Sequence, residues 1–236
     1  MPQENPDNPN TLDTSIECVL FDLDGTLIDT APDFFQVVNK LTAENNRPAI
    51  SRERIDQTVS DGARALVRLA FEISEDHPEF AGLNQRLLDL YYEKLEDTES
   101  LLYPGMPELL TALEQHDIPW GIVTNKPEKY SVKLLEQLNL LTRCKSLVCP
   151  DHVQDRKPHP EPIFLALQQL GVATERTIYL GDNIRDIQAA KNADVIAIAA
   201  AYGYLAEDTR VEDWYADFII QAPDQTIGLL NMLKFA

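Results

Sequence analysis

The sequence predicts an α/β protein with a doubly wound, Rossmann-like parallel sheet and an inserted all-helical cap domain. Two observations predict this fold class. Short apolar runs with the composition of strands alternate along the chain with helical patterns, as they do in βαβ units. This alternation is interrupted once, by an interval of about 70 residues in which we find only helical patterns.

The six strand-like runs are short, mostly β-branched or aromatic, and bounded by turn residues. Their near-continuous apolarity suits a parallel sheet that is buried on both faces. We expect strands at residues 16–21, 120–123, 146–149, 177–180, 195–199 and 218–220.

Helical patterns separate the later strand-like runs. Residues 106–116, 127–139 and 162–170 each carry an apolar stripe, and the third pattern stops at Gly171, a residue type that commonly follows a helix end. These segments are expected to be the helices that cover the sheet.

The interrupting interval carries three further helical stripes and no convincing strand. We therefore expect a helical cap at residues 31–103 and an α/β core made of residues 15–30 and 104–236. Residues 1–14 contain three prolines and little apolar content, which predicts a mobile N-terminal tail. The stripes are Phe34, Phe35, Val38 and Leu41; Leu66, Val67, Ala70 and Phe71; and Leu83, Leu87, Tyr91 and Leu95.

Acidic residues outnumber basic residues by 39 to 20 in this chain of 236 residues, giving a formal net charge of −19. Such a chain repels nucleic acid and anionic membrane surfaces, so neither is an expected partner. An anionic substrate would have to meet local cations, which a bound divalent metal ion can supply. Three scattered cysteines, no signal peptide and no apolar run of membrane-spanning length predict a soluble, cytoplasmic protein.

The first strand-like run ends in two carboxylates. Asp22 and Asp24 follow it, and Gly25 and Thr26 come next. Ligands of open α/β sheets bind beyond the carboxyl ends of the strands, and strand alternation directs residues 22 and 24 to the same side. The alternative is a turn without a ligand, because Asp-Gly commonly forms hairpin loops.

Three more segments place polar side chains near predicted strand ends. Thr124 and Asn125 end one run, Lys157 lies in a proline-stiffened loop, and Asp182 and Asp186 follow another run. Each has a simpler interpretation: a structural threonine, a solvated lysine, and an aspartate that caps a helix. Their shared position at strand ends favours one common site.

In this order, the segments DLDGT, VTN, RKPHPEP and GDNIRD resemble the motifs of the haloacid dehalogenase superfamily, and the resemblance spans residues 16–236. The chain is most similar to the phosphatase branch, in which a helical cap is inserted after the first motif. The resemblance implies a phosphoric monoester hydrolase. Dehalogenase members lack an acid two residues after the nucleophile because halide needs no protonation, so Asp24 favours phosphate chemistry.

The resemblance also implies catalytic roles. Asp22 would attack phosphorus and become an aspartyl phosphate, while Asp24 would protonate the leaving alkoxide and then activate water. Thr124 and Lys157 would hold the phosphoryl oxygens. The neighbouring motif residues Thr26 and Asn125 are counted with these phosphate-binding candidates.

A magnesium site is implied by the same resemblance. Its ligands would be the Asp22 carboxylate, the Asp24 backbone carbonyl and Asp182, and Asp186 would act through water or orient Lys157. Magnesium prefers oxygen ligands and retains several waters, which suits an Asp-rich and His-poor site.

The expected substrate is a small phosphate ester, bound by a monomer or a homodimer. Residues 59–64 form a break between two cap helices, and Arg64 in this break could bind a substrate carboxylate. The alternative is that Arg64 lies on the surface of the next helix, solvated or paired.

Family members called phosphoglycolate phosphatases share this layout, including a Tyr-Gly-Tyr like that at residues 202–204. The segments GARALVRLAF, PWGIVTNKP and VCPDHV resemble the N-acetylmuramic acid 6-phosphate phosphatases of bacterial cell-wall recycling.

Three alternatives remain beside a phosphatase acting on one of these two esters. A sugar phosphomutase shares all four motifs. A non-catalytic phospho-acceptor module of the receiver type also uses an aspartate on an α/β sheet, but it is shorter and has no large helical insertion. A zinc site is the third alternative, and its ligands would be Cys149, Asp151, His152 and His159.

Overall fold

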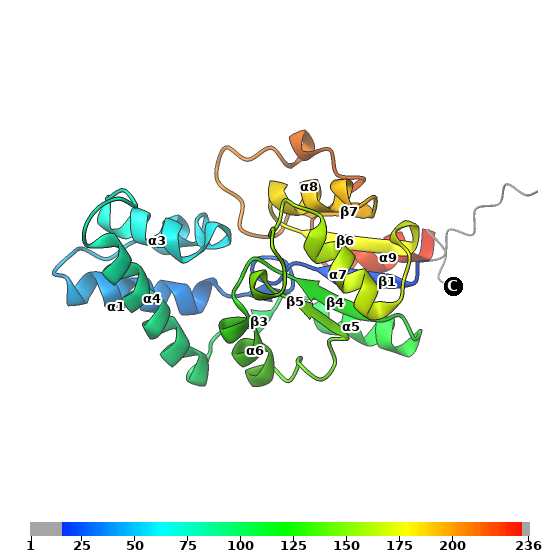
Figure 1. The fold of residues 1–236 in the computed structure, drawn as a ribbon, viewed down its shortest axis with the longest axis horizontal. Helices are drawn as coiled ribbons and strands as arrows, with labels where there is room; N and C mark the ends of the chain where they lie inside the picture. Colours follow the sequence, from blue (N-terminus) through cyan, green and yellow to red (C-terminus); the bar gives the residue numbers. More distant parts are fainter. Residues whose placement is uncertain (1–15, 233–236) are drawn as a thin grey trace, which may run out of the picture.

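The computed structural model describes residues 16–232 of the chain, and the tail expected at residues 1–14 lies outside them. A helical module and an α/β core lie next to each other, and Figure 1 shows the module as the lobe that carries α1, α3 and α4. The fold class predicted from the sequence is confirmed.

The core contains a sheet of six strands in the order β5-β4-β1-β6-β7-β8, and each neighbouring pair is parallel. The first strand of the chain, β1, lies in the middle, between β4 and β6. The chain builds the sheet outward from β1 in one direction and then in the other, which makes it doubly wound. The strands are β1 (Cys18–Phe21), β4 (Trp120–Val123), β5 (Ser146–Val148), β6 (Thr177–Gly181), β7 (Ile196–Ala200) and β8 (Phe218–Ile220).

Helices cover both faces of this sheet. Along β1, Cys18 and Leu20 pack in one apolar cluster, with side chains of α7 and α8. Val19 and Phe21 pack in the other cluster, with side chains of α5, α6 and α9. Because successive strand residues point to opposite faces, a strand with helices on both sides must be apolar at every position. These helices are α5 (Met106–Gln115), α6 (Glu128–Gln137), α7 (Glu161–Leu170), α8 (Ile184–Asn192) and α9 (Gln225–Met232).

The helical module follows β2 and packs around the expected apolar stripes. Phe34 of α1 stacks on Tyr91 of α4, with ring centroids 4.3 Å apart and an angle of 7° between the rings. Most stripe residues are buried, whereas Phe35 and Leu83 are half-buried. The elements are α1 (Ala31–Glu44), α2 (Arg52–Asp56), η1 (Val59–Asp61), α3 (Gly62–Phe71), α4 (Phe80–Lys94) and η2 (Leu95–Asp97).

One expectation about the module was wrong. The interval 31–103 contains a strand, β3 (Leu101–Leu102), which pairs antiparallel with β2 (Ile28–Asp29). The pair joins the segments by which the chain enters and leaves the module. Two residues per strand are too few to give an alternating pattern, so this pairing leaves no signal in the sequence. The division at residues 30/31 and 103/104 stays a prediction.

The remaining short helices are η3 (Pro150–His152), η4 (Thr174–Arg176) and η5 (Val211–Trp214). Within residues 16–232, no helix combines the length and the apolarity that are needed to cross a bilayer.

Candidate active site

The candidate site lies at the carboxyl ends of three neighbouring strands. Asp22 directly follows β1, Thr124 directly follows β4, and Asp182 directly follows β6. Because β1 pairs in parallel with both neighbours, these three ends lie along one edge of the sheet. This edge is the place where doubly wound sheets bind ligands.

Three carboxylates converge at this edge. Asp22, Asp182 and Asp186 each offer an oxygen, and these oxygens all lie within 4.8 Å of one another. All three residues are buried, with 9%, 1% and 0% of their surface exposed. Asp24 is absent from this group of side chains, because its carboxylate points to another partner.

Lys157 supplies a buried cation beside these acids. Its ammonium lies 2.8 Å from Asp22 Oδ1 and 2.7 Å from Asp186 Oδ1. It also donates to the Val123 carbonyl at 2.9 Å and to the Tyr179 hydroxyl at 2.8 Å. Burial alone would lower the pKa of Lys157, but the two carboxylates hold it above its ordinary value, so the ammonium remains charged.

Asp186 has two structural roles at once. Its Oδ2 accepts from the Asn183 backbone at 3.0 Å, which completes a capping box at the start of α8. Its Oδ1 pairs with Lys157. Asp186 therefore caps α8 and also pairs with Lys157.

The acids carry more negative charge than Lys157 can offset. Burial raises the pKa of Asp22 to about 6. Burial, followed by repulsion from Asp22 and Asp186, raises the pKa of Asp182 to about 8. A divalent cation among the three carboxylates would relieve this repulsion, and the all-oxygen donor set matches a hard cation such as Mg²⁺. The residues present therefore fit the metal that the resemblance implies.

Asp182 is held by hydrogen bonds from three parts of the chain. It accepts from the Thr26 hydroxyl at 2.9 Å, the Ser60 hydroxyl at 2.8 Å and the Tyr204 backbone at 3.0 Å. Thr26, which was expected to bind phosphate, thus contacts the acidic cluster. Ser60 belongs to η1, so the helical module reaches the site through this residue.

Gly203 lets the chain pass directly over Asp182. A Cβ at position 203 would lie 2.3 Å from Asp182 Cβ and 2.4 Å from the Gly25 carbonyl oxygen. We expect Gly203→Ala to displace Asp182, to lower the free energy of unfolding by about 1–3 kcal/mol and to weaken metal binding. Thermal denaturation with and without Mg²⁺ measures both effects.

Gly82→Ala is the matched control for this change, because no atom of the described residues lies within 4 Å of the added Cβ on α4. It should be neutral or slightly stabilising, since alanine favours helix. If Gly203→Ala kept the stability and the Mg²⁺ response of the unchanged chain, the close packing on Asp182 would have no functional role.

Asp24 pairs with a cation that the sequence analysis did not single out. Lys126 lies 2.7 Å from Asp24 Oδ1, and the Thr30 hydroxyl donates to the same oxygen at 2.6 Å. The Lys126 ammonium also lies 4.5 Å from the Tyr91 ring centroid and 5.2 Å from that of Phe34. Lys126 directly follows Thr124 and Asn125, so its place in that motif was the available signal.

The other two phosphate-binding candidates, Thr124 and Asn125, contact the backbone of Lys126 and of Lys157. Thr124 is 3% exposed, and its hydroxyl accepts from the Lys126 backbone at 3.1 Å. The Asn125 amide donates to the Lys157 carbonyl at 3.0 Å, while its Oδ1 has no partner among residues 16–232. Both residues line a cavity that also contains Asp22.

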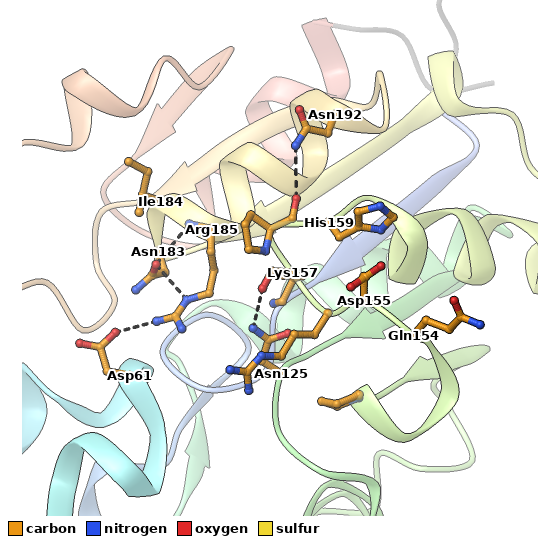
Figure 2. A pocket seen from close by; sticks show the side chains of 13 residues that line it. Asp61, Asn125, Gln154, Asp155, Lys157, His159, Asn183, Ile184, Arg185 and Asn192 are labelled. Carbon is orange, nitrogen blue, oxygen red and sulfur yellow. Dashed lines mark hydrogen bonds and ion pairs between the residues drawn. The ribbon is translucent and has the colours of Figure 1, made fainter. Parts of the chain in front are cut away.

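The structure pairs Arg64 with Glu75 at the edge of this cavity. Its Nε donates to Glu75 at 2.9 Å, its guanidinium makes a second contact with the same carboxylate, and 60% of its side chain is exposed. The break that contains Arg64 does approach the core, but through other residues. Arg185 donates to the Ser60 carbonyl at 2.9 Å and to Asp61 at 2.7 Å. Figure 2 shows this guanidinium between Asn183 and Asp61.

The cavity lies between the module and the core and has a volume of about 310 Å³. Asp22, Asp24, Thr124 and Lys157 line its core side. Its module side is formed by side chains of α1, η1, α3 and α4. Because Lys126 and Lys157 line the core side and aromatic and apolar side chains line the module side, the cavity can hold an anionic group at one end and the rest of a small molecule at the other.

The four zinc candidates do not come together. His152 Nδ1 accepts from the Cys149 backbone at 3.1 Å, and Asp151 accepts from the Glu128 backbone at 2.8 Å. Among residues 16–232, His159 groups with Asp155 and Glu161 instead, on the exposed surface. Local turn and cap contacts account for Cys149, Asp151 and His152.

The chain is similar to known proteins over most of its length. Residues 19–200 match the family model of the haloacid dehalogenase-like hydrolases. An N-acetylmuramic acid 6-phosphate phosphatase of Pseudomonas aeruginosa is 41% identical over 216 residues, covering 92% of this chain and 95% of the relative. A phosphoglycolate phosphatase of Xanthomonas campestris is 39% identical over 210 residues, covering 88% and 93%.

A solved structure has the same fold. The crystal structure of a predicted phosphoglycolate phosphatase from Haemophilus somnus aligns with a TM-score of 0.80 at 25% identity, covering 91% of this chain and 97% of that one. The chain belongs to the haloacid dehalogenase-like hydrolases. Within this family it is a phosphoric monoester hydrolase.

Proposed function

We propose that this phosphatase is Mg²⁺-dependent and acts through an aspartyl phosphate on Asp22, with N-acetylmuramic acid 6-phosphate as its substrate. The observation that carries the mechanism is the convergence of Asp22, Asp182 and Asp186 around one point, with Lys157 in contact with two of them. Phosphoryl transfer depends mainly on positioning and on charge neutralisation, and this cluster offers both.

In the first step, an Asp22 carboxylate oxygen attacks phosphorus and the bond to the ester oxygen breaks. Lys157 and Thr124 hold the phosphoryl oxygens, and Asp24 gives its proton to the leaving alkoxide. In the second step, Asp24 takes a proton from water, whose oxygen attacks phosphorus and releases phosphate and Asp22. Each step is an easier displacement than direct hydrolysis by water.

Bound Mg²⁺ would neutralise negative charge as the anionic phosphate meets Asp22. The carboxylates of Asp22 and Asp182 and the Asp24 backbone carbonyl are its proposed ligands, with Asp186 behind them orienting Lys157. Thr26 and Ser60 keep Asp182 in place through their hydroxyls.

The identity of the ester is supported by the names of the relatives. The Pseudomonas aeruginosa relative is named for N-acetylmuramic acid 6-phosphate, and the match covers nearly the whole of both chains. Phosphoglycolate is the second candidate, because the Xanthomonas campestris relative is named for it. Both esters carry a carboxylate; Arg64 would bind it only in competition with Glu75.

A panel of phosphate esters tests this choice. The ratio kcat/KM should be about tenfold or more higher for N-acetylmuramic acid 6-phosphate than for phosphoglycolate. A preference for phosphoglycolate would overturn the choice of substrate without affecting the mechanism. A requirement for a sugar bisphosphate, with transfer of the phosphoryl group to a sugar, would identify a phosphomutase.

Asp182 gives a prediction about pH and metal binding. Its pKa is about 8 in the folded chain and 3.8 ordinarily, so between these values the folded state holds a proton that the unfolded chain has lost. Without metal, the free energy of unfolding therefore falls as the pH rises through this window. Mg²⁺ binds the deprotonated carboxylates, so it should raise Tm more at about pH 8.5 than at about pH 5.5.

Thermal denaturation with Mg²⁺ and with a chelator measures this difference. Asp182→Asn is the control: it removes the titrating group and should abolish the Mg²⁺-dependent gain at both pH values. An equal or larger gain at the acidic pH would contradict the proposed ligand role of Asp182.

A further inference from the structure

The cavity beside Asp22 is lined by several buried polar atoms without partners. Within the described part of the chain, four buried side-chain atoms lack a hydrogen bond: Asn84 Oδ1, Tyr91 OH, Asn125 Oδ1 and Thr226 Oγ1. Three of these four residues, all except Thr226, line this one cavity. Because unpaired buried polar atoms are costly, their concentration indicates a cavity built around a polar ligand.

Two of these residues belong to the same face of α4. Asn84, Leu88 and Tyr91 line the cavity and are separated by four and three positions, the spacing of neighbours on a helix surface. Asn84 and Tyr91 therefore form a polar pair with an apolar side chain between them. Phe34 and Val59 add apolar surface to the same wall.

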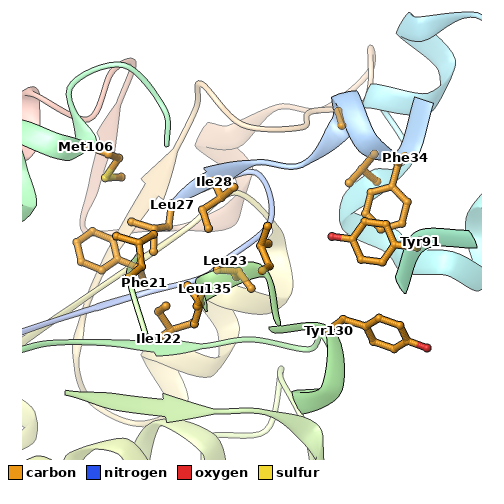
Figure 3. Close-up of a cluster of buried hydrophobic side chains, with 14 of the residues drawn as sticks. Phe21, Leu23, Leu27, Ile28, Phe34, Tyr91, Met106, Ile122, Tyr130 and Leu135 are labelled. Atoms are coloured by element: carbon orange, nitrogen blue, oxygen red, sulfur yellow. The ribbon is translucent and has the colours of Figure 1, made fainter. Parts of the chain in front are cut away.

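The Tyr91 hydroxyl is aimed toward the catalytic edge. Tyr91 is 1% exposed, and Figure 3 shows it stacked on Phe34 with its hydroxyl on the side that faces Leu23, the residue between Asp22 and Asp24. Burial raises the pKa of Tyr91, so the hydroxyl stays neutral. The Lys126 ammonium lies close enough to lower the pKa of Tyr91 in part, and as a pure donor it leaves the proton of the Tyr91 hydroxyl without an acceptor.

The chemistry of these atoms distinguishes between classes of alcohol. Asn84 Oδ1 can only accept a hydrogen bond, and the Tyr91 hydroxyl can donate or accept. Ionised phosphate and carboxylate groups offer acceptors only, so phosphoglycolate would leave Asn84 Oδ1 unpaired. A sugar hydroxyl or an amide N–H would satisfy it, and an acyl methyl group would suit the apolar surface at Leu88.

We propose that the α4 face formed by Asn84, Leu88 and Tyr91 is the specificity-determining subsite for the alcohol part of the substrate, and that it selects a sugar-sized alcohol with hydroxyl or amide donors. This subsite rests on the proposed phosphatase function. It names the residues that would recognise the alcohol released from the phosphate ester. It assigns substrate selection to α4 and not to Arg64.

Tyr91→Phe and Asn84→Leu test the subsite, because each removes polar atoms with little change in size. For N-acetylmuramic acid 6-phosphate we expect kcat/KM to fall about three- to tenfold in each variant, the effect of one lost neutral hydrogen bond. For phosphoglycolate and p-nitrophenyl phosphate the change should stay within about twofold. Equal losses on all three esters, or no loss on the sugar phosphate, would overturn the proposal.

The neighbouring helix positions provide matched controls. Tyr92→Phe and Gln85→Leu make the same chemical changes at residues that do not line the cavity, and they should leave kcat/KM unchanged for all three esters. A loss in the controls equal to that in the test variants would indicate a general effect on α4 and would overturn the subsite.

A binding measurement separates the subsite from the catalytic proposal. In an Asp22→Asn background, calorimetry should show that Tyr91→Phe weakens binding of N-acetylmuramic acid 6-phosphate about three- to tenfold. Unchanged affinity would overturn the subsite even if the enzyme is an active phosphatase. Weakened affinity would support the subsite even if Asp22 were not the nucleophile.

Discussion

Asp22→Asn is expected to lower kcat for p-nitrophenyl phosphate by about 10⁴- to 10⁶-fold, the range seen when a catalytic nucleophile is removed. The reason is that the amide of asparagine cannot form an acyl phosphate with the substrate. The fold should survive, because the amide oxygen can still accept from Lys157, which lies 2.8 Å from Asp22 Oδ1.

The stability of this variant is a second readout. Burial and repulsion from Asp186 raise the pKa of Asp22, so its negative charge is held at a cost in the folded state. Replacing it by a neutral amide should leave Tm unchanged or raise it. Asp208→Asn, at an exposed position, is the control and should keep full activity. If Asp22→Asn retained substantial turnover, another group would have to be the nucleophile.

Lys157→Met is expected to reduce both activity and stability. The Lys157 side chain is 1% exposed and lies between Asp22 and Asp186. Its loss would leave two buried carboxylates without their cation, a change that costs about 3–5 kcal/mol when a buried pair is broken. It would also remove the charge that is proposed to hold the phosphoryl group, so kcat should fall about 100-fold or more.

A double variant separates these two effects. Lys157→Met combined with Asp186→Asn removes one of the two unpaired negative charges as well, so it should recover part of the lost Tm without recovering activity. Circular dichroism melting curves and steady-state kinetics measure the two quantities. If activity returned along with stability, Lys157 would have a structural role only.

Much of the site follows from the sequence because parallel strands end at one edge. Once residues 18–21, 120–123 and 177–181 are recognised as strands, the residues that follow them must lie together. The convergence of Asp22, Thr124 and Asp182 is therefore a consequence of local patterns plus sheet order. The capping role of Asp186 was also predictable, because it depends only on residues in the first turn of its own helix.

Other parts of the site depend on contacts that leave no local pattern. Lys126 and Asp24 are 102 positions apart, and only the packing of the two loops determines that they pair. Ser60 and Asp182 are 122 positions apart. The expectation that residues 59–64 approach the core agrees with the contact between Ser60 and Asp182. The sequence could not show that Ser60 makes this contact while Arg64 pairs with Glu75.

The proposed aspartyl phosphate can be tested directly. Asp24→Asn should allow p-nitrophenyl phosphate, whose leaving group needs no protonation, to phosphorylate the enzyme, while the loss of the base slows release of phosphate. Reduction with borohydride then converts the acyl phosphate to homoserine, which peptide mass spectrometry locates in the chain. We predict homoserine at position 22 only. Homoserine at Asp182, Asp186 or any other acidic residue would contradict the proposed mechanism.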